Sequence, residues 1–184
     1  MNQLIQWDQQ LFLALNLHPP GHLFERFFLT ITDLGSAYWA ISLSTVTLLL
    51  LYRKQAVKTL VVGAGFSIAI AAITFILKHK IGRLRPASVL PQLAHSVGQE
   101  LYTHSFPSGH AMSAFAVLGF LYVIDRRLFY IWLPFSILVA WSRIYIGAHF
   151  PLDVLGGAVL GFVPAVVVAH LFRLRLYRPR NRLN

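Results

Sequence analysis

The chain contains five apolar stretches, each near or within the length that a helix needs to cross a lipid bilayer. A spanning helix requires about 17–25 predominantly apolar residues. The stretches are Ser36–Tyr52, Ala56–Leu77, Ser108–Ile124, Leu128–Gly147 and Leu152–Phe172. Any one of them alone could be a buried helix of a soluble protein. Five within 184 residues predict an all-α, polytopic membrane bundle with about five transmembrane helices.

Composition supports a lipid environment. The chain is 57% hydrophobic and 12% charged, whereas soluble domains carry about 25% charged residues. The net charge of +10 does not predict a nucleic-acid partner, because the basic residues lie between apolar runs and form no patch among polar neighbours. Cysteine is absent, which excludes disulfides and thiolate-bound metal ions.

The N-terminal segment differs from the rest of the chain. Apolar residues from Leu4 to Leu17 are interleaved with Gln and Asp, which predicts an amphipathic helix lying at the membrane interface. A Pro-Pro-Gly sequence at residues 19–21 ends this helix, and a second short helix is expected at about His22–Asp33. We expect one domain over residues 1–184, with an interfacial segment 1–35, a transmembrane core 36–172 and a basic tail 173–184.

The distribution of lysine and arginine predicts the orientation. Ten of the 16 basic residues fall on one side of the membrane if the five spans alternate in direction. They are Arg53, Lys54, Lys58, Arg126, Arg127, Arg173, Arg175, Arg178, Arg180 and Arg182. Positive charge marks the cytoplasmic side. We therefore expect an integral protein of the cell (inner) membrane, with a cytoplasmic C-terminus and with the Lys78–Pro107 loop outside.

Three motifs fall at the outer ends of the predicted spans. They are Lys78 and Arg85-Pro86 with six residues between them, Pro107-Ser108-Gly109-His110, and Ser142-Arg143 followed by His149 and Asp153. Charged residues at membrane depth are unfavourable and usually functional. Alternating spans bring the three motifs to one face, although they extend over about 75 residues of sequence.

The first chemical feature of this face is its affinity for anions. Arginine presents a planar fork that matches phosphate oxygens, and lysine adds a point charge, so Lys78, Arg85 and Arg143 suit a phosphoryl group. Ser108 and Gly109 stand where a helix should begin. Ser108 can cap that helix. The free N–H groups and the dipole at the N-terminus of the helix also favour an anion.

The second feature is a pair of histidines. His149 and Asp153 are four residues apart, on one face of the helix opened by Pro151. A carboxylate on one ring nitrogen fixes the tautomer and leaves the other nitrogen free to attack. His110 can then protonate the leaving oxygen. Each feature alone has a simpler explanation, namely a structural hydrogen bond, a helix start or a lipid headgroup site, but their coincidence predicts a phosphoryl-transfer site.

Together the motifs K-x6-RP, PSGH and SR-x5-H-x3-D resemble those of the type 2 phosphatidic acid phosphatase superfamily, in its membrane lipid phosphatase branch. The resemblance implies a phosphohistidine on His149, with Asp153 orienting the ring and His110 acting first as general acid and then as base. The phosphate-binding residues that it implies are Lys78, Arg85, Ser108, Gly109 and Arg143. No cluster of carboxylates or cysteines offers a metal site, so we expect no metal ion and no other cofactor.

The identity of the lipid is less constrained, because the motifs contact the phosphate and not the tail. The stretch Ala140–Gly157 is most similar to bacterial undecaprenyl-diphosphate phosphatases of this superfamily. Phosphatidylglycerophosphate, phosphatidate and lipid A are alternatives, as is transfer of the phosphoryl group to another lipid or sugar. A non-catalytic protein that binds or moves lipids would need the cations but not two histidines and an aspartate. The expected partners are a phosphorylated lipid substrate and membrane lipids.

The loop Ile81–Phe106 is expected to cap the site. Its neighbourhood contains further polar residues that no motif assigns to catalysis, and we predict contacts with the lipid headgroup for them. They are His79, Lys80, Arg83, His95, Glu100 and His104.

Overall fold

The computed structural model describes residues 3–16, 22–39, 41–42, 45–46, 53–98 and 101–176. Within these residues it contains helices and loops and no strand, so the predicted all-α class is confirmed. The helices are α1 (Gln3–Leu15), α2 (His22–Leu34), α4 (Arg53–Ile81), α5 (Pro86–Val89), α6 (Gly109–Ile124), α7 (Arg126–Tyr145) and α8 (Pro151–Leu176).

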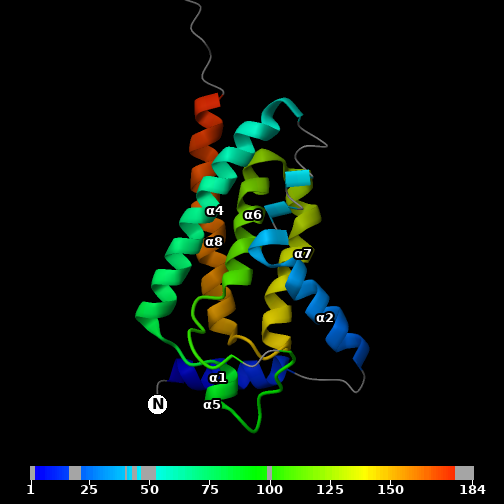
Figure 1. Cartoon of the computed structure of the whole chain (residues 1–184), viewed down its shortest axis with the longest axis vertical. Coiled ribbons are helices and arrows are strands. Elements are labelled where there is room, and N and C mark those ends of the chain that lie inside the picture. Colours follow the sequence, from blue (N-terminus) through cyan, green and yellow to red (C-terminus); the bar gives the residue numbers. More distant parts are fainter. Residues whose placement is uncertain are drawn as a thin grey trace, which may run out of the picture.

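Four of the helices run along the long axis of the molecule in alternating directions (Figure 1). α4 and α7 run toward the end where α1 and α5 lie, whereas α6 and α8 begin there. We call this the site end, because the C-terminal ends of α4 and α7 meet the N-terminal ends of α6 and α8 at it. The predicted convergence of the three motifs at one face is therefore confirmed.

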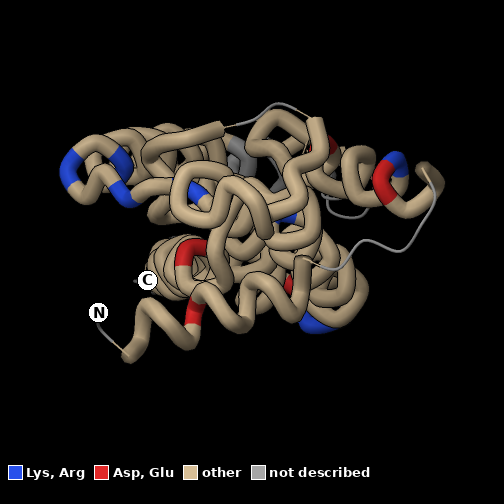
Figure 2. Tube along the Cα trace, turned by 90° about the horizontal axis from the view of Figure 1, so that it is seen from below, with Lys and Arg blue, Asp and Glu red and all other residues tan. Residues whose placement is uncertain are grey.

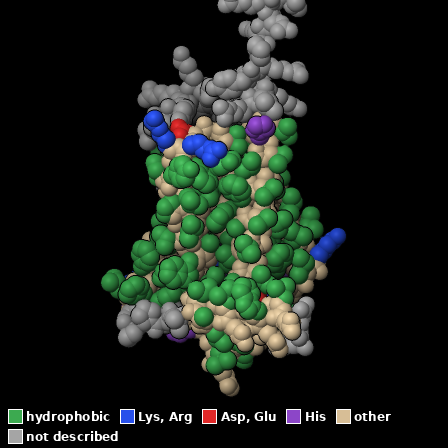
Figure 3. All heavy atoms as spheres, turned by 180° about the vertical axis from the view of Figure 1, so that it is seen from behind, with side chains coloured by type: hydrophobic (Ala, Val, Ile, Leu, Met, Phe, Trp, Pro, Cys, Tyr) green, Lys and Arg blue, Asp and Glu red, His purple; other side chains and the backbone are tan. Residues whose placement is uncertain are grey.

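The lengths of the helices bear on the number of membrane spans. Among the described residues, three segments are long and apolar enough to cross a bilayer, namely Val61–Val89, Arg126–Tyr145 and Pro151–Leu171. The predicted span at Ser108–Ile124 corresponds to α6, an apolar helix of only 16 residues. The predicted span Ser36–Tyr52 lies largely outside the described residues, so a total of five remains a prediction. Hydrophobic side chains cover most of the face of the bundle that Figure 3 shows.

Close packing of α6 against α8 places two of the motifs side by side. α8 presents Gly157 and Gly161 to α6. A Cβ atom at Gly157 would collide with the carbonyl oxygen of Ser108, and one at Gly161 would collide with that of Met112. Small residues four apart let membrane helices approach closely. The start of α6 consequently lies on the first turns of α8, where the Ser108 amide donates to the Asp153 carbonyl oxygen at 3.0 Å.

α1 lies across the site end rather than along the bundle (Figure 1). Asp8, Phe12 and Asn16 are buried at intervals of four residues, whereas Leu4 and Trp7 in the first turns of the helix are exposed. The predicted amphipathic helix is confirmed, but its buried face carries a carboxylate and ends at a buried amide. The Asn16 side chain donates to the carbonyl oxygens at the end of α7, which fastens α1 to the bundle.

α2 packs on the site half of α7. The ring of Phe28 stacks on that of Tyr145 with centroids 4.1 Å apart. One helical turn later, Thr32 is also buried and faces α7. The predicted second short helix is thus confirmed, and it supplies a side chain to the site described below.

Candidate active site

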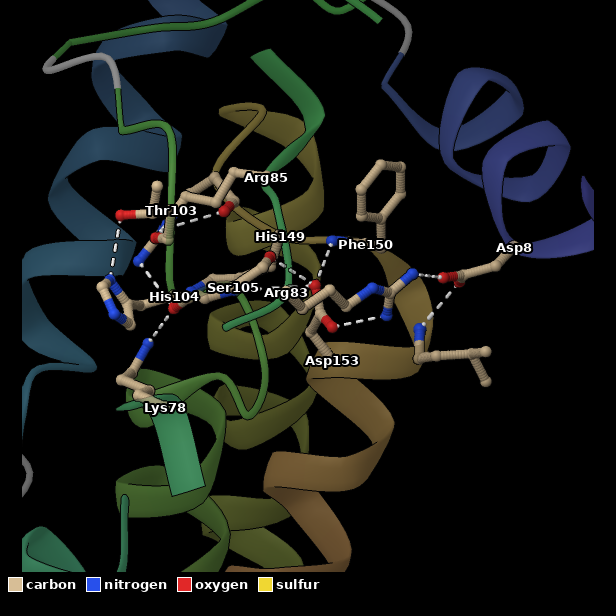
Figure 4. Close-up of polar contacts among 12 residues, drawn as sticks. Asp8, Lys78, Arg83, Arg85, Thr103, His104, Ser105, His149, Phe150 and Asp153 are labelled. Carbon is tan, nitrogen blue, oxygen red and sulfur yellow. Dashed lines mark hydrogen bonds and ion pairs between the residues drawn. The ribbon is translucent and has the colours of Figure 1, made fainter. Parts of the chain in front are cut away.

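Lys78 and Arg85 of the first motif and His149 and Asp153 of the third lie together at the site end of the bundle (Figure 4). The end of α4 contributes Lys78, and the loop that follows contributes Arg85. Hydrogen bonds join these segments to the loop between α7 and α8, as when Arg85 Nη1 donates to the Ala148 carbonyl oxygen at 2.8 Å. Viewed from this end, basic positions lie near the middle of the trace as well as at its edges (Figure 2).

Arg85 is a buried cation held by neutral oxygens. Its Nε donates to the Thr103 carbonyl oxygen at 2.8 Å, and its Nη2 lies 3.5 Å from the carbonyl oxygen of His104. Within the described residues, its three side-chain hydrogen bonds go to backbone carbonyls, which carry no formal negative charge. A guanidinium placed in this way attracts an anion.

Lys78 shares one of these carbonyls. Its Nζ donates to the His104 oxygen at 2.7 Å, so one carbonyl lies between two cations. His104 has a φ of 59°, in the left-handed region that non-glycine residues rarely adopt. The loop of residues 101–106 thus contacts both cations through the carbonyls of Thr103 and His104. That the Ile81–Phe106 loop caps the site stays a prediction.

Arg143 is the third cation, at the end of α7. Its Nη1 donates to Thr32 Oγ1 of α2 at 2.6 Å. Its Nε is buried and has no hydrogen-bond partner within the described part of the chain, and the same is true of Ser108 Oγ. Buried donors are nearly always satisfied in proteins. Both atoms belong to motif residues, and an anionic oxygen would satisfy both.

Ser108 also corrects one expectation. It occupies the N-cap position of α6, but its side chain makes no capping hydrogen bond. Its backbone amide is used instead, in the bond to Asp153 that ties α6 to α8. The hydroxyl is therefore free of a structural task, while the first amides of α6 retain the preference of a helix N-terminus for an anion.

The expected pairing of His149 with Asp153 is different in detail. His149 lies in the turn before α8, which begins at Pro151, and not on the helix itself. Its Nδ1 lies 3.9 Å from Asp153 Oδ2, too far for a hydrogen bond. Ser105 bridges the two, because its Oγ donates to Asp153 Oδ2 at 2.6 Å and lies 3.4 Å from His149 Nδ1.

The carboxylate of Asp153 is fixed from several directions. Besides Ser105, the amide of Phe150 donates to Oδ2 at 2.9 Å, as the N-cap amide does to the third helical residue in a capping box. Arg83 Nη1 donates to Oδ1. Arg83 was expected to contact the lipid headgroup, and this expectation is wrong for its guanidinium, which bonds Asp153 and Asp8.

The ring of His149 is buried and surrounded by positive charge. Burial first, and then the charges of Arg143, Arg85 and Lys78, hold the pKa of His149 well below the ordinary value near 6.5. Its neutral, nucleophilic form therefore persists below that pH. With Nδ1 turned toward the Ser105–Asp153 pair, Nε2 is the nitrogen that remains for attack.

His110 lies in the first turn of α6 and lines a large apolar cavity with Lys78 and Gly109. The cavity has a volume of about 620 Å³ and runs between α4 and α6. Ala37, Ile41 and Thr45 complete its wall. An apolar cavity that begins at charged motif residues suits a ligand with a charged head and a hydrocarbon body.

Four residues that contact the site escaped the sequence analysis or were misassigned by it. They are Asp8, Thr32, Arg83 and Ser105. Arg83 and Ser105 lie within a few residues of the motifs, so proximity was an available signal. The signal for Asp8 and Thr32 is weaker. Each is a polar residue that lies four residues from a buried Phe on the same helix. The described residues contain no group of three or more His, Cys, Asp or Glu side chains suited to a metal ion.

Comparison with known proteins completes the description. The family model described as "PAP2 superfamily" matches residues 60–177, more than half of the chain. The lipid A 4'-phosphatase of Porphyromonas gingivalis is 30% identical over 96% of this chain and 76% of its own length. An undecaprenyl-diphosphatase of Sulfolobus acidocaldarius is 24% identical over 86% of this chain and 75% of its own. The crystal structure of a transmembrane PAP2-type phosphatidylglycerolphosphate phosphatase from Bacillus subtilis superposes with a TM-score of 0.74 at 25% identity, covering 98% of this chain and 90% of that one.

Proposed function

We propose that this chain, which belongs to the PAP2 superfamily and resembles its membrane lipid phosphatases, is a metal-independent phosphatase. The proposed reaction proceeds through a phosphohistidine at His149. The resemblance noted in the sequence is thereby confirmed at the level of the family. The roles of individual residues and the choice of lipid are our proposal. It includes a single domain with its site on the extracytoplasmic face of the cell (inner) membrane.

One observation carries the proposal. Three cations, Lys78, Arg85 and Arg143, donate to neutral oxygens within the described part of the chain, and they lie around a buried histidine, His149, whose Nδ1 faces the Ser105 hydroxyl. We call these three residues the cation cradle. A cradle without carboxylate partners attracts a phosphate dianion, and a neutral histidine beside it is a nucleophile. The combination suits a covalent phosphoryl transfer better than it suits binding alone.

The proposed reaction has two steps. His149 Nε2 attacks phosphorus while the bond to the leaving oxygen breaks, and His110 gives that oxygen a proton. His110 then takes a proton from water, the water oxygen attacks the phosphohistidine, and inorganic phosphate leaves with His149 restored. In each transition state, charge spreads over the equatorial oxygens, where the cradle, the Ser108 hydroxyl and the Gly109 amide stabilise it. Asp153 stabilises the positive charge that develops on the His149 ring.

For the substrate we propose undecaprenyl diphosphate in the outer leaflet. The apolar cavity that starts at Lys78 and His110 supports a long hydrocarbon tail, and the Ala140–Gly157 stretch supports the polyprenyl class. Relatives named for undecaprenyl diphosphate and for lipid A both match the chain. Phosphatidylglycerophosphate, phosphatidate and lipid A are accordingly the competitors in the test.

The test is a phosphate-release assay on the purified full-length protein in mixed micelles. We expect undecaprenyl diphosphate to give the highest kcat/KM of the four lipids, and His149→Ala to release no phosphate from any of them. A higher kcat/KM for another lipid would overturn the proposed substrate and leave the phosphatase class intact. Release of phosphate by none of the lipids would overturn the class itself.

A further inference from the structure

A row of alternating charges connects α1 to the site (Figure 4). Arg83 lies between two carboxylates. Its Nη2 donates to Asp8 Oδ2, and its Nη1 donates to Asp153 Oδ1. Both carboxylates are completely buried, whereas the Arg83 side chain is 24% exposed. Arg83 thus bridges a helix at the membrane surface and the carboxylate that faces the proposed nucleophile.

Asp8 makes a second bond that strengthens this bridge. Its Oδ1 accepts from the amide of Leu152 at 2.9 Å, in the first turn of α8. One oxygen of Asp8 therefore fixes the guanidinium, and the other fixes the backbone next to Asp153. Without both bonds, burial of the Asp8 carboxylate would lower the stability of the fold. The burial of Asp8 next to Arg83 and Leu152 therefore points to a role at the site.

Aromatic packing connects α1 to the segment around Asp153 by a second route. The Arg83 guanidinium lies over the ring of Phe150, 4.8 Å from its centroid. Phe12 of α1 meets that ring edge-on, with centroids 5.3 Å apart. The amide of Phe150 in turn donates to Asp153. α1 is therefore connected to the segment 149–153 in three ways. Phe12 packs against Phe150, Asp8 accepts from the Leu152 amide, and Asp8 binds Arg83, which in turn binds Asp153.

We propose that Arg83 is a positioning residue for the reaction and that Asp8 on α1 anchors it. This inference rests on the proposed function, because it concerns the role of Asp153 in orienting His149. Arg83 holds Asp153 Oδ1, which turns Oδ2 toward Ser105 and His149. Docking of α1 is then part of the active site, and the exposed apolar residues at the start of α1, Leu4, Ile5 and Trp7, couple that docking to the membrane surface.

The anions orthovanadate and sulfate test the proposal without a lipid. Five-coordinate vanadate takes an apical nitrogen from the nucleophilic histidine and depends on its orientation, whereas sulfate requires only the cation cradle. For Arg83→Gln we expect vanadate to bind about 10-fold or more weakly and sulfate to bind within about twofold of the wild type. An equal loss for both anions would show that Arg83 is a further cradle cation, and no loss for either would also overturn the proposal.

Lipid turnover supplies the second readout. Arg83→Gln should lower kcat about 10- to 100-fold with KM within about twofold, and Asp8→Asn should lower kcat about 3- to 10-fold. The double variant should be no slower than Arg83→Gln, because both act through one bridge. Arg83→Lys should fall between Arg83→Gln and the wild type, since lysine can reach one carboxylate at a time. Losses that multiply in the double variant would overturn the bridge.

Asn16→Ala is the matched control for α1 docking, because Asn16 fastens the helix to α7 without contacting Arg83. We expect it to lower the melting temperature in detergent as Asp8→Asn does, yet to keep kcat and vanadate affinity within about twofold of the wild type. Gln10→Ala, exposed on the same helix, should change neither stability nor kcat. Equal losses of kcat in Asn16→Ala and Asp8→Asn would show that Asp8 only anchors α1 to the bundle, and the proposed link from Asp8 to the site would be wrong.

If the wild type hydrolyses no lipid, the proposed function fails, while the comparison of vanadate with sulfate still decides the role of Arg83.

Discussion

The site contains two kinds of cation, and they differ in the groups to which they are hydrogen-bonded. The cation cradle, Lys78, Arg85 and Arg143, donates to carbonyl and hydroxyl oxygens. Arg83, a few residues away in sequence, donates to two carboxylates. Neutral partners hold a cation in place and leave its charge for a ligand. Charged partners cancel the charge and turn the same side chain into a mechanical link.

This difference shows that proximity to a site does not define a function for a basic residue. Arg83 and Arg85 are two residues apart, but one is held by Asp8 and Asp153 and the other by Thr103, Ala148 and His104 carbonyls. We therefore expect substitutions in the cradle to weaken anion binding. Substitutions around Asp153 should slow the chemical step instead.

The largest expected effect separates chemistry from binding altogether. His149→Ala should lower phosphate release by at least about 10⁴-fold, since no nucleophile remains, while sulfate binding persists because the cradle is intact. The measurement pairs phosphate release with sulfate titration. His170→Ala, an exposed histidine farther along α8, is the control and should retain activity. Appreciable turnover by a clean His149→Ala preparation would contradict the phosphohistidine mechanism.

Next in size is the loss of a two-pronged contact in the cradle. Arg143→Lys should lower kcat about 100- to 1000-fold, because lysine keeps the charge but cannot offer two parallel donors to the equatorial oxygens. Vanadate affinity should fall with it. Arg127→Lys, exposed at the other end of α7, should leave both quantities unchanged. If vanadate binds Arg143→Lys as tightly as the wild type, the cradle has been placed wrongly.

A smaller effect is expected on the carboxylate side of the comparison. Ser105→Ala removes the hydroxyl that bridges Asp153 and His149, and it should lower kcat about 10- to 100-fold with sulfate affinity unchanged. Ser88→Ala serves as the control, since the Ser88 hydroxyl bonds the Tyr102 carbonyl oxygen in the same loop and touches neither residue. A rise in KM without a fall in kcat would assign Ser105 to the cradle.

The smallest expected effect is that of chelation. Three fixed cations can supply the charge stabilisation for which other phosphatases use a metal ion. Activity in excess EDTA should therefore stay within about twofold of the untreated enzyme, in a lipid-supplied assay of the purified protein. Full loss of activity, restored by one divalent ion, would show that the cradle is not sufficient.

Much of the fold follows from local sequence. The positions of α1, α2, α4, α6, α7 and α8 were expected from apolar runs and from Pro and Gly at their ends, because hydrophobicity and helix termination depend on neighbouring residues. Alternation of the helices then brought distant motifs to one end without any knowledge of packing. The sequence did not reveal that Gly157 and Gly161 let α6 approach α8, since the partner of a glycine lies outside its own segment.

The sequence by itself determined which motif residues are present and how they are spaced, because both are properties of the chain alone. His149, Asp153, His110 and the cations of the cradle all follow from the three motifs. Only the tertiary structure decided how each charge is used. It gave Arg83 two carboxylates, interposed Ser105 between His149 and Asp153, and brought Asp8 to the site from about 145 residues away in sequence. The physical reason is that the energy of a charge depends on the atoms around it, and those atoms come from segments that only folding brings together.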